Sequence, residues 1–129
     1  MDAQAPVYER VRQELKVGRK QSHWMWFIFP QIAGLGQSPM SVRFAIASLD
    51  EAKAYLANPV LGARLRECAQ LTLDVEDKTG RDIFGSIDEM KFRSSMTLFA
   101  RAAPDEDIFQ RCLDKYFAGA PDSATLAKL

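Results

Sequence analysis

Residues 86–102 read SIDEMKFRSSMTLFARA, and this stretch decides the fold. Its first four residues, Ser-Ile-Asp-Glu, match the spacing of a capping box, which predicts that a helix begins here. Phe92, Met96 and Phe99 follow at the spacing i, i+4 and i+7, so they share one face of that helix. A face of large apolar side chains is expected to be buried. We therefore expect a helix over Ser86–Ala102 that packs against the rest of the molecule.

Helix signals of the same kind mark the rest of the chain. Cap residues before apolar periodic stretches, with glycine or proline after them, predict further helices at 6–17, 22–29, 38–44, Leu49–Ala57, 58–75, 81–84, 105–117 and 123–128. The run WMWFIF could also form a buried strand, but no other segment shows the alternating pattern of a partner strand. The sequence thus predicts an all-α fold, a compact single domain over residues 1–129 with roughly seven or eight helices.

The composition is typical of one soluble domain. The chain has 129 residues, of which 47% are hydrophobic, and its 17 basic and 17 acidic residues cancel. Zero net charge does not favour nucleic acid or an anionic membrane as a partner. No apolar run is long enough to span a bilayer, and the first residues lack a signal-peptide core. Cys68 and Cys112 are too few for a disulfide framework, which favours a cytoplasmic location.

One candidate site lies in residues 19–31, RKQSHWMWFIFPQ, which hold the only histidine and both tryptophans. On a helix, His23 shares a face with Trp26 and Phe27, three and four positions further on. One interpretation is a pocket in which an aromatic wall stacks on a planar ligand and His23 transfers a proton. The other is a core helix in which His23 makes one hydrogen bond, because aromatic residues at helical spacing usually belong to the core.

A second candidate is KFRSSMTLF, residues 91–99, in the central helix. Lys91, Ser94 and Ser95 lie together beside the apolar face, and a lysine with two hydroxyl groups one turn away can hold a phosphate or a carboxylate. Alternatively, the serines allow close helix packing while the lysine extends toward solvent. The Arg19-Lys20 and Lys91/Arg93 clusters are the only support for nucleic-acid binding.

The third segment is QIAGLGQSPM, residues 31–40, with two glycines before a Ser-Pro helix start. It is either an ordinary connection or a loop whose N–H groups face an anion, and it has neither Walker nor Rossmann spacing. One histidine and two distant cysteines do not suggest a zinc site, and no nucleophile-elbow motif supports a Ser-His-Asp triad. The sequence therefore predicts no metal and no cofactor.

Long stretches of the chain resemble a known family. They include HWMWFIFPQIAGLG, then DIFGSIDEM and KFRSSMTLF, and finally the D-x-x-T-L pattern of residues 122–126. In this order, and over nearly the whole chain, they resemble the bacterial family called domain of unknown function 1810. The resemblance implies a compact all-helical fold and no particular activity.

The chain also departs from that family. Members usually have further residues at the N-terminus, so the resemblance predicts that this chain is either short at its start or has a miscalled start site. Where they have His-Pro, this chain has Asn58-Pro59, which keeps a helix cap but not any catalytic role of that histidine. Some members carry a calpastatin-like label. We reject it because such inhibitors are polar, repetitive and disordered when free, whereas this chain is apolar and non-repetitive.

Two hypotheses about function follow. In the first, the chain binds or turns over a small anionic or nucleotide-like ligand between the two distinctive segments. Its expected site has His23 as the catalytic residue and, as ligand-binding residues, Lys20, Trp24, Trp26, Gln31, Lys91, Arg93 and Ser95. In the second, the chain is a non-enzymatic interaction module with an exposed apolar patch and no enclosed polar pocket. Neither hypothesis fixes the oligomeric state.

Overall fold

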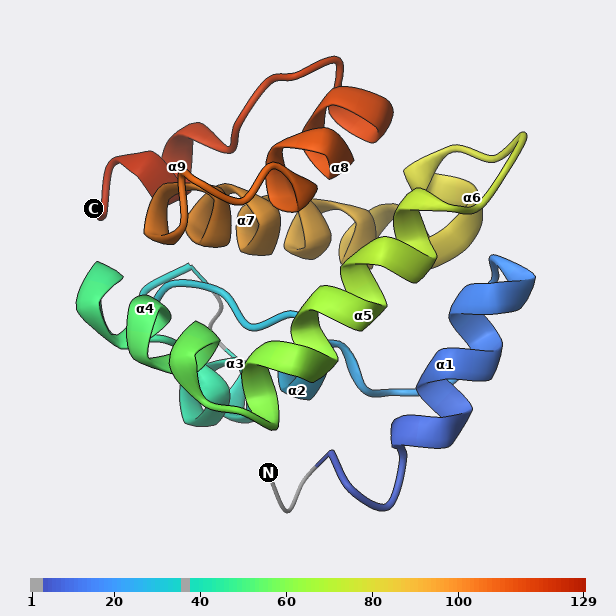
Figure 1. The fold of residues 1–129 in the computed structure, drawn as a ribbon, viewed down its shortest axis with the longest axis horizontal. Helices are drawn as coiled ribbons and strands as arrows, with labels where there is room; N and C mark the ends of the chain where they lie inside the picture. The colour runs from blue at the N-terminus through green and yellow to red at the C-terminus, as the bar shows by residue number, and fades with distance from the viewer. Residues whose placement is uncertain (1–3, 36–37) are drawn as a thin grey trace.

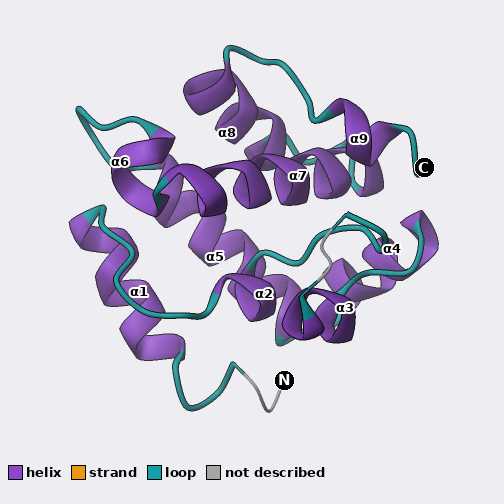
Figure 2. Ribbon diagram, turned by 180° about the vertical axis from the view of Figure 1, so that it is seen from behind, coloured by secondary structure: helices purple, strands orange, loops and turns teal. Residues whose placement is uncertain are grey.

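The computed structural model describes residues 4–35 and 38–129, and the regular elements in these ranges are all helices (Figure 1, Figure 2). They are α1 (Tyr8–Val17), α2 (Met25–Ile28), α3 (Pro39–Phe44), α4 (Leu49–Ala57), α5 (Leu61–Leu73), α6 (Gly80–Phe84), α7 (Ser86–Ala102), α8 (Ile108–Phe117) and α9 (Ser123–Leu126). The all-α prediction is confirmed, and each expected segment overlaps one of these helices. β pairing in the described ranges is limited to one parallel bridge between Ile32 and Ile46.

Helix α7 lies at the centre of the molecule. It contacts α2, α4, α6, α8 and α9, and in Figure 1 it runs horizontally with α8 and α9 above it and α4 below. The ring centroid of Phe92 lies 4.9 Å from that of Phe29 and 4.8 Å from that of Phe84. Phe92, Met96 and Phe99 are all completely buried, as their spacing predicted. The stretch of α7 from Phe92 to Phe99 is therefore the core onto which the other helices pack.

The start of α7 differs from the prediction. Ser86 does not cap the helix but is its first residue, and the cap position is Gly85, which provides no side chain. Gly85 also ends α6, and its φ of 83° turns the chain directly from one helix into the next. Such a positive φ is readily adopted by glycine. Because one residue serves both helix ends, no separate position remains for a serine cap.

The expected helix over residues 22–29 is also shorter than predicted. Ser22 does not cap it, because its hydroxyl and its backbone N–H both donate to the carboxylate of Glu14. Helix α2 begins only at Met25, so His23 precedes the helix. The predicted helical face shared by His23, Trp26 and Phe27 is therefore wrong.

Several other caps follow the sequence signals. Ser38, Ser48 and Asp122 each accept a hydrogen bond from the backbone N–H three residues further on. The Asn58 side chain accepts from the N–H groups of residues 60 and 61, so asparagine does supply a cap ahead of α5. These local interactions explain why so much of the helical pattern could be read in advance.

Both cysteines are free and buried. Burial raises the pKa of the Cys68 and Cys112 thiols to about 12, so neither is a thiolate at neutral pH. They are the small core side chains that their sequence neighbours predicted. None of the helices in the described ranges combines the length and apolarity needed to cross a membrane.

Phe92→Ala is expected to lower the free energy of unfolding by about 3–5 kcal/mol, because it leaves a cavity between aromatic rings. Ile87→Ala on the same helix is the control. Its side chain is 72% exposed, so its effect should stay within about 0.5 kcal/mol. Urea unfolding followed by circular dichroism measures both variants. Equal losses would contradict the central place of Phe92.

Candidate functional site

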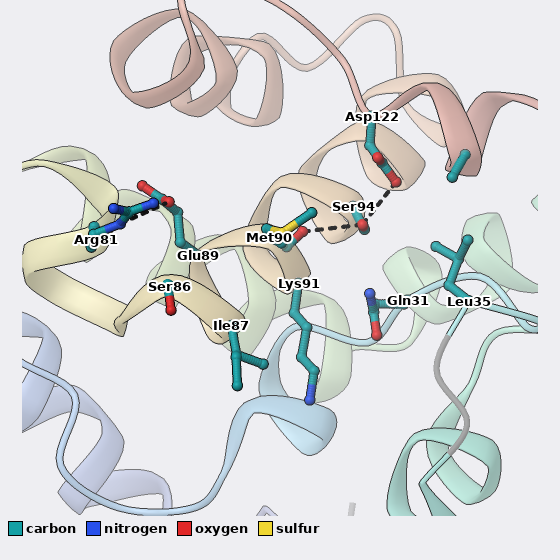
Figure 3. Close-up of a pocket in the computed structure, with 11 residues that line it drawn as sticks. Gln31, Leu35, Arg81, Ser86, Ile87, Glu89, Met90, Lys91, Ser94 and Asp122 are labelled. Carbon is teal, nitrogen blue, oxygen red and sulfur yellow. Dashed lines mark hydrogen bonds and ion pairs between the residues drawn. The ribbon is translucent and has the colours of Figure 1, made fainter.

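An open groove of about 480 Å³ runs along the first half of α7 (Figure 3). Its walls come from α7, from α6, from the segment that follows α2, and from the start of α9. The lining residues are Gln31, Leu35, Arg81, Ser86, Ile87, Glu89, Met90, Lys91, Ser94, Asp122 and Ala124. We call it the α7 groove. Its volume lies within the range of about 300–1,000 Å³ that small-molecule sites occupy.

The floor of the α7 groove is apolar. Ile87 and Met90 are 72% and 66% exposed, and they stand three residues apart on the same side of α7. Leu35, which is partly buried against the core, continues this apolar surface at the opposite wall. Two large apolar side chains exposed next to each other form a surface that a bound molecule could cover.

Lys91 supplies a cation at the wall of the groove. Its ammonium lies 5.2 Å from the centre of the Trp26 ring and 4.0 Å from the nearer carboxylate oxygen of Asp88. The second distance is at the limit of an ion pair, and within the described ranges Lys91 donates no hydrogen bond. The Lys91 charge is therefore only weakly compensated by its own chain.

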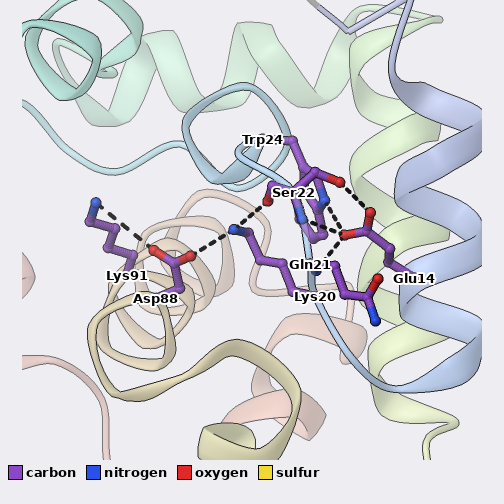
Figure 4. A network of polar contacts seen from close by, with 7 residues as sticks. All are labelled: Glu14, Lys20, Gln21, Ser22, Trp24, Asp88 and Lys91. Atoms are coloured by element: carbon purple, nitrogen blue, oxygen red, sulfur yellow. Dashed lines mark hydrogen bonds and ion pairs between the residues drawn. The ribbon is translucent and has the colours of Figure 1, made fainter.

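The reason is that Asp88 is already engaged by a second lysine (Figure 4). The Lys20 ammonium lies 2.8 Å from Asp88 Oδ2, donates to the carbonyl of Ser22 at 2.6 Å, and sits 5.2 Å from the Trp24 ring centre. The Lys20 side chain is only 8% exposed. Lys20 thus joins the segment after α1 to α7, and its charge is neutralised there.

Glu14 anchors the other end of this network. Its carboxylate accepts from the N–H of Gln21 at 2.7 Å, from the indole N–H of Trp24 at 2.9 Å, and from both donors of Ser22. Burial opposes ionisation of Glu14, but these hydrogen bonds outweigh it and hold the pKa of its carboxyl below the ordinary value. Sequence reasoning missed this residue because its partners follow seven to ten positions later, with no local motif.

The opposite wall is held by Asp122. Its Oδ2 atom accepts from the Ser94 hydroxyl at 2.8 Å, from the Thr125 N–H at 3.2 Å and from the Thr125 hydroxyl at 2.5 Å. These bonds cap α9 and attach it to α7. The sequence predicted the cap, but it gave no sign that Asp122 would also line a groove.

Some of the predicted site residues line the α7 groove or contact residues that line it, and others lie elsewhere. Lys91 and Gln31 line it, and Lys20 lies in the network behind Lys91. Trp24 is 1% exposed and Ser95 is fully buried, so both are core residues that a ligand does not reach. The geometry therefore gives no support to the expected ligand contacts of these two residues.

Arg93 does not join Lys91. Its guanidinium donates to the carbonyls of Ala120 at 3.0 Å and Pro121 at 3.2 Å, where it holds the loop before α9. Arg93 is among the expected ligand-binding residues, but it does not lie beside Lys91, because residues two apart on a helix point in different directions.

His23 is exposed, and it is not among the residues that line the α7 groove. Trp26 lines a separate pocket of about 100 Å³, together with Gln4, Phe27, Pro30, Phe44, Tyr55 and Leu61. Gly36 and Gln37 lie outside the described residues, so the suggested anion loop is not tested there. In the described part of the chain, no group of three His, Cys, Asp or Glu side chains could hold a metal ion.

The structure defines an all-helical protein with an open, partly apolar groove on its central helix. The chain belongs to the family described as "Protein of unknown function (DUF1810)", whose model matches residues 1–129. Its structure is similar to the crystal structure of the conserved hypothetical protein Rv1873 from Mycobacterium tuberculosis. The TM-score is 0.97 at 52% sequence identity, over 98% of this chain and 91% of that one. No curated protein matches the chain.

Glu14→Gln is expected to lower the free energy of unfolding at neutral pH by about 1–3 kcal/mol, because a neutral amide cannot replace the carboxylate as an acceptor for all its donors. The folded pKa of Glu14 is lowered, so its stabilising effect is present above the unfolded pKa and is lost as pH falls through the folded pKa. The difference between the two proteins should therefore shrink below about pH 4.

Urea unfolding at neutral and acidic pH measures this difference. Glu76→Gln is the matched control, because Glu76 is exposed and forms no side-chain hydrogen bond with the described residues. A loss for Glu14→Gln that stays constant with pH would show that the charge of Glu14 is not what holds the network.

Proposed function

We propose that this protein binds a small ligand, which carries an anionic group and an apolar body, in the α7 groove. The observation that carries the proposal is the Lys91 ammonium, which lines the groove 4.0 Å from its nearest carboxylate partner. An incoming carboxylate or phosphate would be a closer partner than the one this chain supplies.

The surroundings of Lys91 are suited to holding such a group. The Trp26 ring supports the ammonium from one side, which is a cation–π contact. Gln31 lines the groove as well, and within the described ranges its side-chain amide has no hydrogen-bond partner. A charge-assisted bond from Lys91 and an amide bond from Gln31 would together orient an anionic group.

The rest of the ligand would lie on Ile87, Met90 and Leu35. Covering apolar surface contributes about 2.5 kcal/mol for each 100 Å² removed from water, before the costs of association. A purely inorganic anion would gain nothing from this floor. The geometry therefore favours an organic acid or an organic phosphate, which includes the nucleotide-like ligand that the sequence suggested.

The proposal concerns binding and does not depend on His23. A proton-transfer role for His23 remains a separate prediction, and it would require a ligand that extends beyond the groove lining. His23→Ala should leave ligand affinity unchanged if binding is confined to the α7 groove. A large loss of affinity in His23→Ala would indicate that His23 contacts the ligand.

A second function is favoured by the same exposed side chains. Ile87 and Met90, at 72% and 66% exposure, could instead contact a protein partner. This would be the non-enzymatic interaction module of the sequence analysis. It differs from the first proposal because it does not require the Lys91 charge to meet a small anion.

A thermal-shift screen with carboxylates and phosphates of apolar or aromatic compounds tests the first proposal. A ligand at a hundred times its dissociation constant adds about 2.7 kcal/mol, which should raise the melting temperature by on the order of ten degrees. Lys91→Gln should weaken a genuine ligand about tenfold or more, the equivalent of about 1.4 kcal/mol.

Lys53→Gln is the matched control, because it removes the same charge from an exposed position of α4 outside the groove. A ligand that binds Lys91→Gln as well as the parent protein contradicts the proposed site. A flat screen with a stable protein favours the interaction module.

A further inference from the structure

We infer that the ligand of the α7 groove is a zwitterion whose ammonium and carboxylate stand at opposite ends of an apolar body, as in a short peptide with free termini. This inference rests on the proposed function and names the class of ligand. It comes from a second charge in the groove, which a simple anion would leave unmatched.

That second charge is Asp122. All its side-chain hydrogen bonds reach Oδ2, from Ser94 and from the two donors of Thr125. Across the described ranges, Oδ1 accepts no hydrogen bond and no lysine or arginine forms an ion pair with this carboxylate. Asp122 is only partly buried, and it lines the groove. One oxygen of a fixed carboxylate is therefore open to a donor from outside the chain.

The other charges around the groove compensate one another. Arg81 and Glu89 approach each other only to 3.9 Å on the groove wall, but they supply one charge of each sign, and Lys20 pairs with Asp88 at 2.8 Å behind Lys91. By charge count among the described residues, this leaves Lys91 as the cation without a carboxylate of its own and Asp122 as the unpaired anion. A ligand with a single negative charge would satisfy Lys91 but would bring no cation to Asp122. A ligand with one charge of each sign is complementary to both.

The two charges are set apart along the groove. Lys91 and Ser94 are three residues apart on α7, a rise of about 4.5 Å, and the Asp122 carboxylate lies a further hydrogen bond of 2.8 Å from Ser94. In Figure 3 the Lys91 side chain points away from Asp122, and Gln31 lies between the two in this view. Because the Lys91 side chain points away from Asp122 (Figure 3), its ammonium is farther from that carboxylate than the helix rise and the hydrogen bond alone would place it. This favours a ligand whose charges are well separated over a single α-amino acid.

A peptide of two or three residues separates its two charges further than an α-amino acid does, because an extended chain advances about 3.3–3.6 Å per residue. Its C-terminal carboxylate would meet Lys91 and Gln31, and its N-terminal ammonium would meet Asp122. Its side chains would then lie over Ile87 and Met90, which favours apolar residues. An ω-amino acid of similar length shares this charge arrangement without a peptide bond.

The experiment is isothermal titration calorimetry of the full chain with leucyl-leucine and three analogues. Acetylation of the amine removes the ammonium, amidation of the carboxyl removes the carboxylate, and 6-aminohexanoate keeps both charges without the peptide group. We expect leucyl-leucine to bind and each blocked form to bind about tenfold more weakly or worse, the equivalent of about 1.4 kcal/mol per lost charge contact. Binding of 6-aminohexanoate would assign recognition to the charges, and its failure would assign it to the peptide.

Variants of the protein connect each charge to its partner. The Asp122→Asn variant should bind acetylated and free leucyl-leucine with similar affinity, because the partner of the ammonium is gone. The Lys91→Gln variant should likewise bind amidated and free leucyl-leucine with similar affinity. Asparagine keeps an acceptor and is itself a good helix cap, so α9 should still form. Asp114→Asn is the matched control, because Asp114 is an exposed carboxylate of α8 outside the groove.

The outcomes separate this inference from the function on which it rests. The zwitterion inference is wrong if acetylated and free leucyl-leucine bind equally well. It is also wrong if monoanions bind and leucyl-leucine does not. In both cases the proposal of an anion-binding site is retained. If neither monoanions nor zwitterions bind, both proposals fail. The blocked peptides need no variant, so the inference can be overturned even if Asp122→Asn does not fold.

Discussion

The packing of Phe92 against Phe29 and Phe84 is the contact on which the rest of the structure depends, because it fixes how α7 is turned about its own axis. With 3.6 residues per turn, positions two before and two after a buried residue lie on nearly the opposite side of a helix. Met90 and Ser94 occupy these positions relative to Phe92, and both line the groove. The aromatic core and the groove are therefore two faces of one helix.

The polar network around Glu14 and Lys20 settles which lysine is available to a ligand. Lys20 and Lys91 both have a tryptophan ring 5.2 Å away, and both approach Asp88. Lys20 has the short contact, a backbone acceptor and almost no exposure, so it is fixed in the fold. Lys91 donates no hydrogen bond within the described residues, so its ammonium N–H groups are available to a ligand in the groove. Two lysines with similar surroundings thus have different roles because one carboxylate cannot pair closely with both.

The sequence predicts this fold well where the signals are local and poorly where distant groups compete. Ser38, Ser48 and Asp122 cap helices as expected, because each acts on its own next turn. Ser22 has the same chemistry but is taken by Glu14, eight positions earlier. Of the candidate site, Lys91 and Gln31 were identified. Asp122 could not be, since its place beside Ser94 depends on how the loop before α9 returns to α7.

The exposed apolar residues at the start of α7 can persist because the rest of the helix is so well anchored. A 17-residue helix that is mostly buried from Phe92 onward holds its first two turns in place, although Ile87 and Met90 there are largely uncovered. Ile87 and Met90 remain largely exposed, as they are in the unfolded chain, so they gain little hydrophobic stabilisation on folding. The same rigidity favours binding, because a floor that is already ordered loses little conformational entropy when a ligand arrives. A partner that covers these two side chains would thus gain apolar contact without having to order the helix that carries them.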